Sequence, residues 1–241
     1  MNIVEPAVRL LAHTAIVPDA IEQRLEIQEG STDAETLTVY AGRSCYESWS
    51  RPNEKTREDK DYLRRTLFEQ GHTSILEHAT ATFYITGVSR ALLAEITRHR
   101  HLSFSVRSQR FVSEEDANIV VPPAARKSKA TVVYDSEEFH DDLKGSLPKA
   151  LAWWAGEAAW NYEEIVEALQ GEGLPRKQAR EAARAVLPNM IETKIVVTGN
   201  LRAWHEVIER RTAPDADAEF QQVAGMIRDE LKKLAPAIFK D

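Results

Sequence analysis

Strand-like segments separated by helices of unequal length constrain the fold of this chain more than any other feature. Residues 78–87 alternate and are rich in threonine and aromatics, residues 191–198 form a second such run, and residues 7–17 end at a proline. No regular strand–helix–strand rhythm connects them, so the sequence predicts an α+β fold. Helices are predicted at residues 33–46, 56–70, 137–170, 176–186, 200–211 and 217–238, and in a segment after Ser89.

Local signals set several of these boundaries. Thr32, Ser89 and Asn200 suit N-caps, because their side-chain oxygens can accept hydrogen bonds from the first free amides of a helix. Residues 122–136 open on two prolines and are expected to be irregular. The long helix that follows could break at residues 145–148, which contain glycine and proline.

Composition narrows the class of protein. The chain has 241 residues, 43% of them hydrophobic, which is enough for a single domain over residues 1–241 with a substantial core. Its net charge of −7 argues against sequence-independent binding of nucleic acid. Cys45 is the only cysteine, so no intrachain disulfide can form and a reducing compartment is indicated. With neither a secretory leader nor a long apolar run, we expect a soluble cytoplasmic protein.

The stretch from Arg98 to Phe111 (RHRHLSFSVRSQRF) concentrates arginine, histidine and serine in a chain that is acidic as a whole. Guanidinium groups interleaved with hydroxyls suit a site that holds phosphates together with a polar heterocycle. Arg98 and Arg100 lie two positions apart at a predicted helix end, so they point in nearly opposite directions and could serve two anionic ligands. The alternative is a basic helix end whose side chains are simply solvated.

No glycine-rich phosphate loop of the usual kinds occurs, so side chains must hold any phosphate. The segment GHTSILEH (residues 71–78) has several interpretations. His72, Glu77 and His78 are metal-ligand types, but their spacing matches no standard zinc pattern, so we expect no metal. The segment could instead form a helix-capping turn or a polar turn against a cofactor.

Other candidate residues have a plain structural interpretation. In GNLRAW (residues 199–204), Arg202 could be a surface residue, and Trp204 is more typical of a core. Cys45 lacks a catalytic-cysteine signature and is expected to be a small buried residue. The tryptophans expected to serve helix packing are Trp153, Trp154 and Trp160.

Together these segments resemble the flavin-dependent thymidylate synthases. That family carries Arg-His-Arg, then seven residues, then serine, and Arg98–Arg100 is followed by Ser108 at this spacing. Residues 71–111 look like the actinobacterial branch. The blocks ARAVLP (183–188) and GNLRAW (199–204) also resemble family segments.

The resemblance covers roughly residues 35–235 and implies long helices packed on a mixed sheet, in a homotetramer with active sites at subunit interfaces. It also implies FAD, a uridine monophosphate, methylenetetrahydrofolate and NADPH. By position, the residues that look like flavin contacts are His72, Ser74, Glu77, Arg98, His99, Arg100, Asn200, Arg202 and Glu206. Those that look like nucleotide contacts are Glu95, Arg98, Val106, Arg107, Ser108, Gln109, Arg110, Arg184 and Arg211. The resemblance assigns catalysis to Arg211 and Ser108.

The implied reaction is reductive methylation of dUMP at uracil C5 to give dTMP. Arg211 matches the arginine thought to lie beside the uracil, where a fixed guanidinium stabilises negative charge on the ring. Arg110, Arg184 and Ser108 could hold the 5′-phosphate. The reduced flavin supplies hydride, so Cys45 is not needed as a nucleophile.

The chain departs from the family pattern around these ligands. Val106 stands where the family usually has Glu or Gln, Arg107 where it often has Leu, and Glu206 where it has His or Asn; Phe111 and Asp215 also differ. The principal donors remain, so catalysis is expected to survive. The altered loop leaves open an alternative, the same chemistry on UMP to give 5-methyl-UMP in a nucleoside-antibiotic pathway. An alternative of another class is an RNA-binding protein that uses the arginine cluster.

Overall fold

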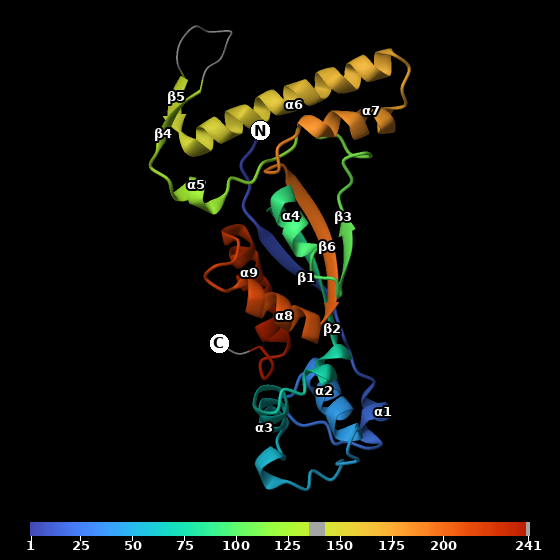
Figure 1. Ribbon diagram of the computed structural model, residues 1–241. Coiled ribbons are helices and arrows are strands. Elements are labelled where there is room, and N and C mark those ends of the chain that lie inside the picture. Colours follow the sequence, from blue (N-terminus) through green and yellow to red (C-terminus); the bar gives the residue numbers. More distant parts are fainter. Residues whose placement is uncertain (135–142, 240–241) are drawn as a thin grey trace.

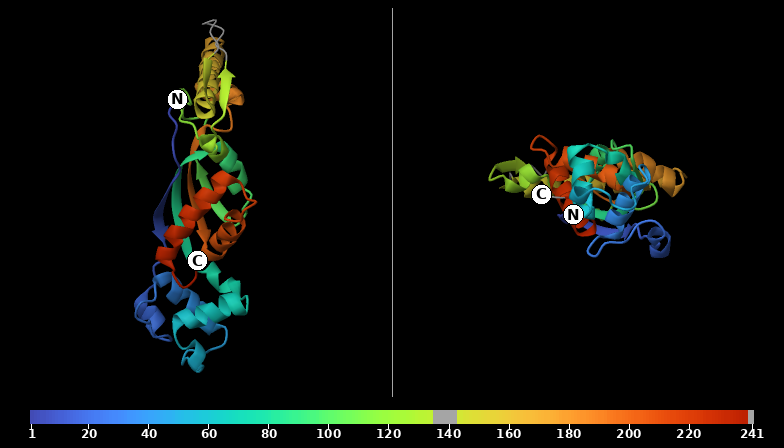
Figure 2. Two further views of the ribbon diagram at one scale, coloured as in Figure 1. Left: turned by 90° about the vertical axis from the view of Figure 1, so that its left-hand side faces the viewer. Right: turned by 90° about the horizontal axis from the view of Figure 1, so that it is seen from below.

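The computed structural model describes residues 1–134 and 143–239 and is elongated, with an upper, a middle and a lower tier (Figures 1 and 2). The middle tier is a four-stranded sheet with the strand order β1-β2-β6-β3. Its strands are β1 (Ala7–His13), β2 (Thr80–Ser89), β3 (Leu102–Val106) and β6 (Glu192–Asn200). A second, two-stranded sheet in the upper tier pairs β4 (Thr131–Tyr134) with β5 (Leu143–Ser146).

Helices cover one face of the central sheet and build both ends of the molecule (Figure 1). Those beside the sheet are α4 (Arg90–Ile96), α8 (Leu201–Arg211) and α9 (Ala218–Leu234). The upper tier contains α5 (Pro123–Lys127), α6 (Leu147–Gly171), α7 (Arg176–Ala183) and the 3₁₀ helix η4 (Arg184–Val186). The lower tier contains α1 (Pro18–Glu22), α2 (Asp33–Ser44), η1 (Glu54–Thr56), α3 (Asp59–Leu63), the π-helix η2 (Arg64–Glu69) and η3 (Thr73–Glu77).

The core lies between the sheet and the helices α4, α8 and α9. Residues along β2 and β6 are alternately buried and half-buried, so one face of the sheet is closed and the other is only partly covered. Trp204 of α8 is fully buried, and its ring meets that of Phe83 edge-on with centroids 5.1 Å apart. Its Nε1 donates a hydrogen bond to the carbonyl of Ala81 at 3.1 Å. Trp204 is therefore a core residue, as expected.

Ser89 begins α4 and ties it to α9. Its Oγ accepts a hydrogen bond from a first-turn amide at 3.0 Å, which confirms the predicted N-cap. The buried carboxylate of Glu219 accepts from Ser89 N at 2.7 Å and from Ser89 Oγ at 2.6 Å. Because α4 has only 7 residues, this anchor also fixes its C-terminal end, from which Arg98–Arg100 continue. The caps predicted at Thr32 and Asn200 are likewise confirmed.

Two expectations about the central elements are wrong. The sheet is antiparallel at every strand pair of the described residues, not mixed, and parallel pairing occurs there only as one bridge between Ile3 and Ile119. The single helix predicted at residues 56–70 is replaced by η1, α3 and η2. Asp59 begins α3 with its side chain paired to Arg51 at 2.5 Å and hydrogen-bonded to Ser31, and these tertiary contacts take the chain out of helical conformation just before it.

The helix predicted at residues 137–170 begins instead at Leu147. Residues 143–146, expected to be helical, form β5 and pair with β4, while residues 137–142 lie outside the described part of the chain. Pro148 explains the boundary, because proline is tolerated in the first turn of a helix but not in its interior. The stretch expected to be irregular instead contains α5 and β4.

Several side chains expected to be buried lie at the surface. Cys45 follows the last turn of α2 and is exposed. Trp154 and Trp160 on α6 are 42% and 58% exposed, although the ring of Trp154 meets that of Tyr134 edge-on with centroids 6.4 Å apart. Trp153 packs against Tyr134 of β4, with ring centroids 5.6 Å apart.

Candidate active site

Arg211 is held at the end of α8 by contacts of different kinds. Its Nε donates to Nε2 of His99 at 3.0 Å, and its Nη1 donates to a carboxylate oxygen of Glu95 at 3.0 Å. The guanidinium also lies over the ring of Phe220, 4.8 Å from the centroid. The side chain is only 16% exposed. A guanidinium fixed in this way can stabilise a developing negative charge without first having to reorganise.

His99 beside it is held in its neutral form. Burial, followed by the positive charge of Arg211, lowers the pKa of the imidazole below its ordinary value of 6.5. Because Nε2 accepts the hydrogen bond from Arg211, the proton of the neutral ring lies on Nδ1. His99 is thus a neutral acceptor that orients Arg211.

Glu95 connects the arginines of this cluster. Its carboxylate accepts hydrogen bonds from Arg211 and from Nη1 of Arg98, the latter at 3.2 Å. Arg100 is exposed and has no hydrogen bond or ion pair with any described residue. The two arginines predicted to point apart therefore differ in their contacts. Arg98 is paired with Glu95, whereas the donors of Arg100 are available to a ligand.

The neighbouring polar residues come from the start of α8 and from the lower tier. Arg202 forms an ion pair with Glu77 of η3. The side chain of Asn200 accepts a hydrogen bond from Ala203 N at 2.8 Å, which orients its amide group. Glu206 pairs with Arg210 at 2.9 Å, which offsets the negative charge that this position adds.

Adjoining cavities join these residues into one run along α8. A cavity of about 230 Å³ is lined by the arginine cluster and shares Glu206 with a second cavity of about 220 Å³. Arg202 lines this second cavity and also a third of about 340 Å³, which extends to Ser74. The run contains every residue expected to contact the flavin, namely His72, Ser74, Glu77, Arg98, His99, Arg100, Asn200, Arg202 and Glu206. Such a lining suits an extended ligand with phosphate groups and a polar ring system.

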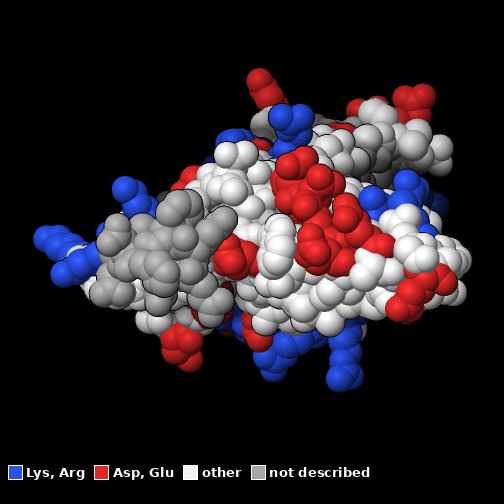
Figure 3. Space-filling view, turned by 90° about the horizontal axis from the view of Figure 1, so that it is seen from above, with Lys and Arg blue, Asp and Glu red and all other residues white. Residues whose placement is uncertain are grey.

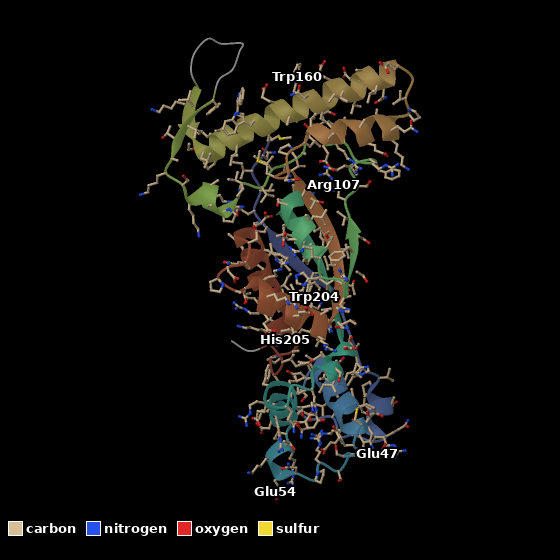
Figure 4. The ribbon with its side chains drawn as sticks, in the orientation of Figure 1. Glu47, Glu54, Arg107, Trp160, Trp204 and His205 are labelled. Carbon is tan, nitrogen blue, oxygen red and sulfur yellow. The ribbon has the colours of Figure 1, made fainter. Side chains whose placement is uncertain are left out.

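The other residues expected to touch the nucleotide lie at the opposite end of β3. The strand leads from Leu102, near the arginine cluster, to Val106, which pairs with Ile195, and this span is roughly 13 Å at about 3.3 Å per residue. Figure 4 shows Arg107 beside α7, well away from Trp204 of α8. Within one chain the structure therefore divides these residues, with Glu95, Arg98 and Arg211 at one end and Val106, Arg107, Ser108, Gln109, Arg110 and Arg184 at the other.

The loop after β3, residues 107–114, contacts α7. Arg110 forms an ion pair with Glu181 at 2.6 Å, and Arg180 donates to the carbonyl of Phe111 at 2.7 Å. Ser108 is half-buried, and its hydroxyl lies 3.4 Å from the amide of Arg110. Arg184, at the start of η4, is exposed, and its side chain makes no hydrogen bond or ion pair with the described residues.

Two members of this loop face inward. The side chain of Gln109 is buried, and Arg107 is directed at the buried carboxylate of Glu114, with Nη1 and Oε2 3.2 Å apart. Burial raises the pKa of Glu114, against the opposing charges of Arg107 and then Arg90. Burial also lowers the pKa of Arg90, and nearby Arg184 lowers it further.

Sequence reasoning missed some residues of both clusters. His101 and Arg210 line the cavity beside Arg211. Each is next in sequence to a residue of a recognised motif, and this proximity could have identified them. Arg90 and Glu114 have no such signal, because only the fold brings the start of α4 against the loop after β3. Acidic side chains gather instead on the upper face (Figure 3), where burial and then Glu115 and other carboxylates raise the pKa of Glu163 on α6.

Two further observations concern other classes of site. In residues 1–134 and 143–239, no three histidine, cysteine, aspartate or glutamate side chains converge as they would around a metal ion. Within the same residues, no helix is both long and apolar enough to cross a membrane.

Known proteins with similar sequences belong to one family. The family model described as thymidylate synthase complementing protein matches residues 27–237. A probable flavin-dependent thymidylate synthase of Mycobacterium phage L5 is 44% identical over 97% of this chain and 96% of its own length. The flavin-dependent thymidylate synthase of Mycobacteroides abscessus is 44% identical over 100% of this chain and 91% of its own.

A solved structure shows the same fold. The crystal structure of thymidylate synthase X from Helicobacter pylori, with FAD and dUMP, superimposes with a TM-score of 0.63 at 21% identity over 98% of both chains. Its likeness supports the α+β architecture found here. With the family model and close relatives spanning nearly the whole sequence, the chain belongs to the flavin-dependent thymidylate synthase family of methyl-transferring enzymes.

Proposed function

We propose that the protein catalyses the FAD-dependent reductive methylation of dUMP at uracil C5 to give dTMP, with methylenetetrahydrofolate as one-carbon donor and NADPH as reductant. The observation that carries the proposal is the run of cavities along α8, in which all residues assigned to the flavin come together. Family membership supports the chemistry, and the FAD and dUMP of the Helicobacter pylori structure support the ligands.

The lining of the run fits FAD. Arg100 has donors free for a pyrophosphate, and Arg202 brings a second guanidinium beside it. Ser74 and Asn200 offer a hydroxyl and an amide to the heteroatoms of a ring system. The chemistry that FAD supplies when bound is hydride transfer.

Arg211 acts on the uracil ring. C5 of uracil attacks a one-carbon unit only when negative charge can develop on the ring, and a guanidinium fixed by His99 and Glu95 stabilises that charge. At the other end of the nucleotide, Ser108 and Arg110 hold the 5′-phosphate through a hydroxyl and a guanidinium, and Arg184 adds a further guanidinium.

The site is shared between copies of the chain. Its two clusters lie at opposite ends of β3, so a nucleotide that meets both is best placed between protomers. The exposed Trp154 and Trp160, with the partly covered face of the sheet, offer surface for such contacts. We therefore propose a homotetramer that acts in the cytoplasm. A chain whose only cysteine is Cys45 cannot form an intrachain disulfide, which suits a reducing compartment.

A competition experiment tests the reaction. The protein is incubated with FAD, NADPH and methylenetetrahydrofolate in the presence of equal dUMP and UMP, and both methylated products are quantified by mass. We expect dTMP to dominate. A yellow, flavin-loaded protein that forms neither product would contradict the proposed activity.

UMP is the second candidate substrate, because Val106 and Arg107 alter the nucleotide loop relative to the family pattern. An excess of 5-methyl-UMP over dTMP in the same experiment would move the assignment to the ribonucleotide.

Binding of RNA by the arginine cluster is a proposal of another class. Arg98 and Arg211 share Glu95, Arg202 is paired with Glu77, and the surface therefore lacks the unbalanced positive charge that backbone binding needs. We expect no shift of RNA in a gel at physiological salt. A colourless protein that shifts RNA would favour this class over the enzyme.

A further inference from the structure

We propose that Arg107 is a positioning residue, which closes the loop of residues 107–114 over the buried carboxylate of Glu114 and so holds Ser108 and Arg110 in place for the nucleotide phosphate. The inference rests on the proposed function. It gives Arg107 a different role from the direct nucleotide contact expected from its place in the sequence.

The contacts of Arg107 span the loop from one end to the other. Its backbone amide donates to the carbonyl of Lys194 on β6 at 2.9 Å, which fixes the point where the loop leaves the sheet. Its Nη1 lies 3.2 Å from Oε2 of Glu114, and its Nη2 donates to the carbonyl of Ser113 at 3.0 Å. One side chain therefore joins the beginning of the loop to its end.

Glu114 depends on this partner. Its side chain is 1% exposed, and burial raises its pKa, which Arg107, then Arg90 and then a hydrogen bond from the side chain of Gln109 lower again. A buried carboxylate without a counter-ion is costly, so loss of Arg107 leaves Glu114 with Arg90 as its nearest remaining positive charge. Opening the loop would return Glu114 to water, and this is the change that Arg107 prevents.

The middle of the loop carries the two residues that we assign to the phosphate, Ser108 and Arg110. The amides of Phe111 and Val112 both donate to the carbonyl of Ser108, at 3.3 and 3.0 Å, in a tight turn. Gln109 is buried beneath this turn, while Ser108 and Arg110 remain accessible. The contact between Arg107 and Glu114, called the clamp below, thus fixes the position of the turn and with it the hydroxyl of Ser108 and the guanidinium of Arg110.

The test compares Arg107→Leu, Arg107→Lys, Glu114→Gln and the double variant Arg107→Leu/Glu114→Gln. Arg57→Leu is the matched control, since Arg57 lies in an exposed ion pair with Glu54 at 4.0 Å, far along the chain from the loop. Two quantities are measured: the hydrogen-exchange rates of amides in residues 108–113 without ligand, and KM for dUMP together with kcat.

Positioning predicts a specific pattern. Arg107→Leu and Glu114→Gln both speed exchange in the loop and raise KM for dUMP by about tenfold with little change in kcat, as for a lost binding contact. The double variant resembles either single variant, because both remove the same clamp. Arg107→Lys restores part of the affinity, since it keeps the charge but cannot make both contacts of the guanidinium. Arg57→Leu changes nothing.

Direct contact between Arg107 and the phosphate predicts a different pattern. Glu114→Gln would then leave KM unchanged or lower it, because it frees the guanidinium for the ligand, and that result would overturn the inference. A normal KM in a folded Arg107→Leu enzyme would overturn it too. If Arg107→Leu does not fold, Arg107→Lys and Glu114→Gln decide the question in the same way. Absence of dUMP methylation by the unaltered enzyme would instead refute the proposed function, while loop exchange would still report on the clamp.

Discussion

At the scale of single residues, the proposed chemistry depends on how firmly the guanidinium of Arg211 is held. Arg211 donates hydrogen bonds to His99 and Glu95, and these contacts fix the direction of its guanidinium. The same glutamate holds Arg98, so a change at Glu95 would release both arginines. A site of this kind is sensitive to changes that keep the charge but alter the geometry.

Replacement of Arg211 tests its assignment. We expect Arg211→Ala to lower kcat about 100- to 1,000-fold, the range seen when one donor to a developing anion is removed. The flavin absorbance of the purified protein should persist, because Arg98, Arg100 and Arg202 remain. Arg211→Lys should recover little, since an ammonium cannot reach both partners. Near-normal turnover by Arg211→Ala would refute the role.

The contact between Arg211 and His99 predicts a dependence on pH. The pKa of His99 is lowered in the folded protein, so as the pH falls below 6.5 the unfolded chain takes up the proton first. The free energy of unfolding should therefore decrease on acidification, from about pH 6.5 down to the lowered pKa. Urea unfolding of the protein and of His99→Gln at pH 7.5 and 5.5 checks this. The variant should lose less stability, and equal losses would contradict the assignment.

Cys45 offers a negative test of the mechanism. It is exposed, and Arg211 rather than a thiolate is assigned to the activation of the uracil. We expect Cys45→Ser to keep kcat and KM within about twofold, as surface substitutions usually have small effects. Cys45 also lines the third cavity of the run, so flavin retention is measured alongside. Complete loss of turnover in a folded, flavin-loaded variant would contradict this mechanism.

At the scale of elements, the strands do more than carry the core. β2 and β6 bring Ser89 and Glu192 to one end and Asn200 to the other, so the sheet separates the two clusters by a fixed length. The register at the upper end depends on Gly87, whose φ is +66°. A Cβ there would stand 1.9 Å from the carbonyl oxygen of Glu5, and this backbone group cannot move aside.

Gly87→Ala should therefore destabilise the protein by about 2 kcal/mol or more, from the unfavourable backbone conformation together with the clash. Gly225→Ala is the matched control. It lies inside α9 with nothing within 4 Å of the new methyl group, and it should be neutral or stabilise by about 0.5–1 kcal/mol. Denaturant midpoints compare the two, and equal stabilities would contradict this account of the sheet end.

Local signals predicted some elements well and others poorly, for physical reasons. The caps at Thr32, Ser89 and Asn200 depend on neighbours three residues away, so the sequence contains the information. The broken helix at residues 56–70 depends on Arg51 and Asp59, whose pairing only the fold brings about. Propensity cannot anticipate such a contact.

The candidate site divides in the same way. Family motifs led to the flavin-assigned residues of the cavity run, but they could not show that Arg107 turns inward. That orientation depends on Glu114, which becomes buried only when the loop closes against β6 and α4.

At the scale of the whole molecule, we propose that one active site is built from two distant parts of different protomers. The exposed tryptophans of α6 and the partly covered sheet show that a single chain leaves apolar surface open. Within that chain the cluster of Arg211 and the loop of Ser108 stay apart. In a homo-oligomer with closed symmetry, the Arg211 end of one protomer can lie against the Ser108 end of another.

The most direct test mixes two impaired chains. Arg211→Ala and Ser108→Ala variants are co-expressed with different tags, and assemblies that contain both are purified through both tags. At dUMP concentrations below the KM of the unaltered enzyme, each variant alone should have low activity, Arg211→Ala through kcat and Ser108→Ala through KM. The mixed assemblies should regain about a quarter of the unaltered activity if chains associate at random. Mixed assemblies as inactive as either parent would contradict a site shared between protomers.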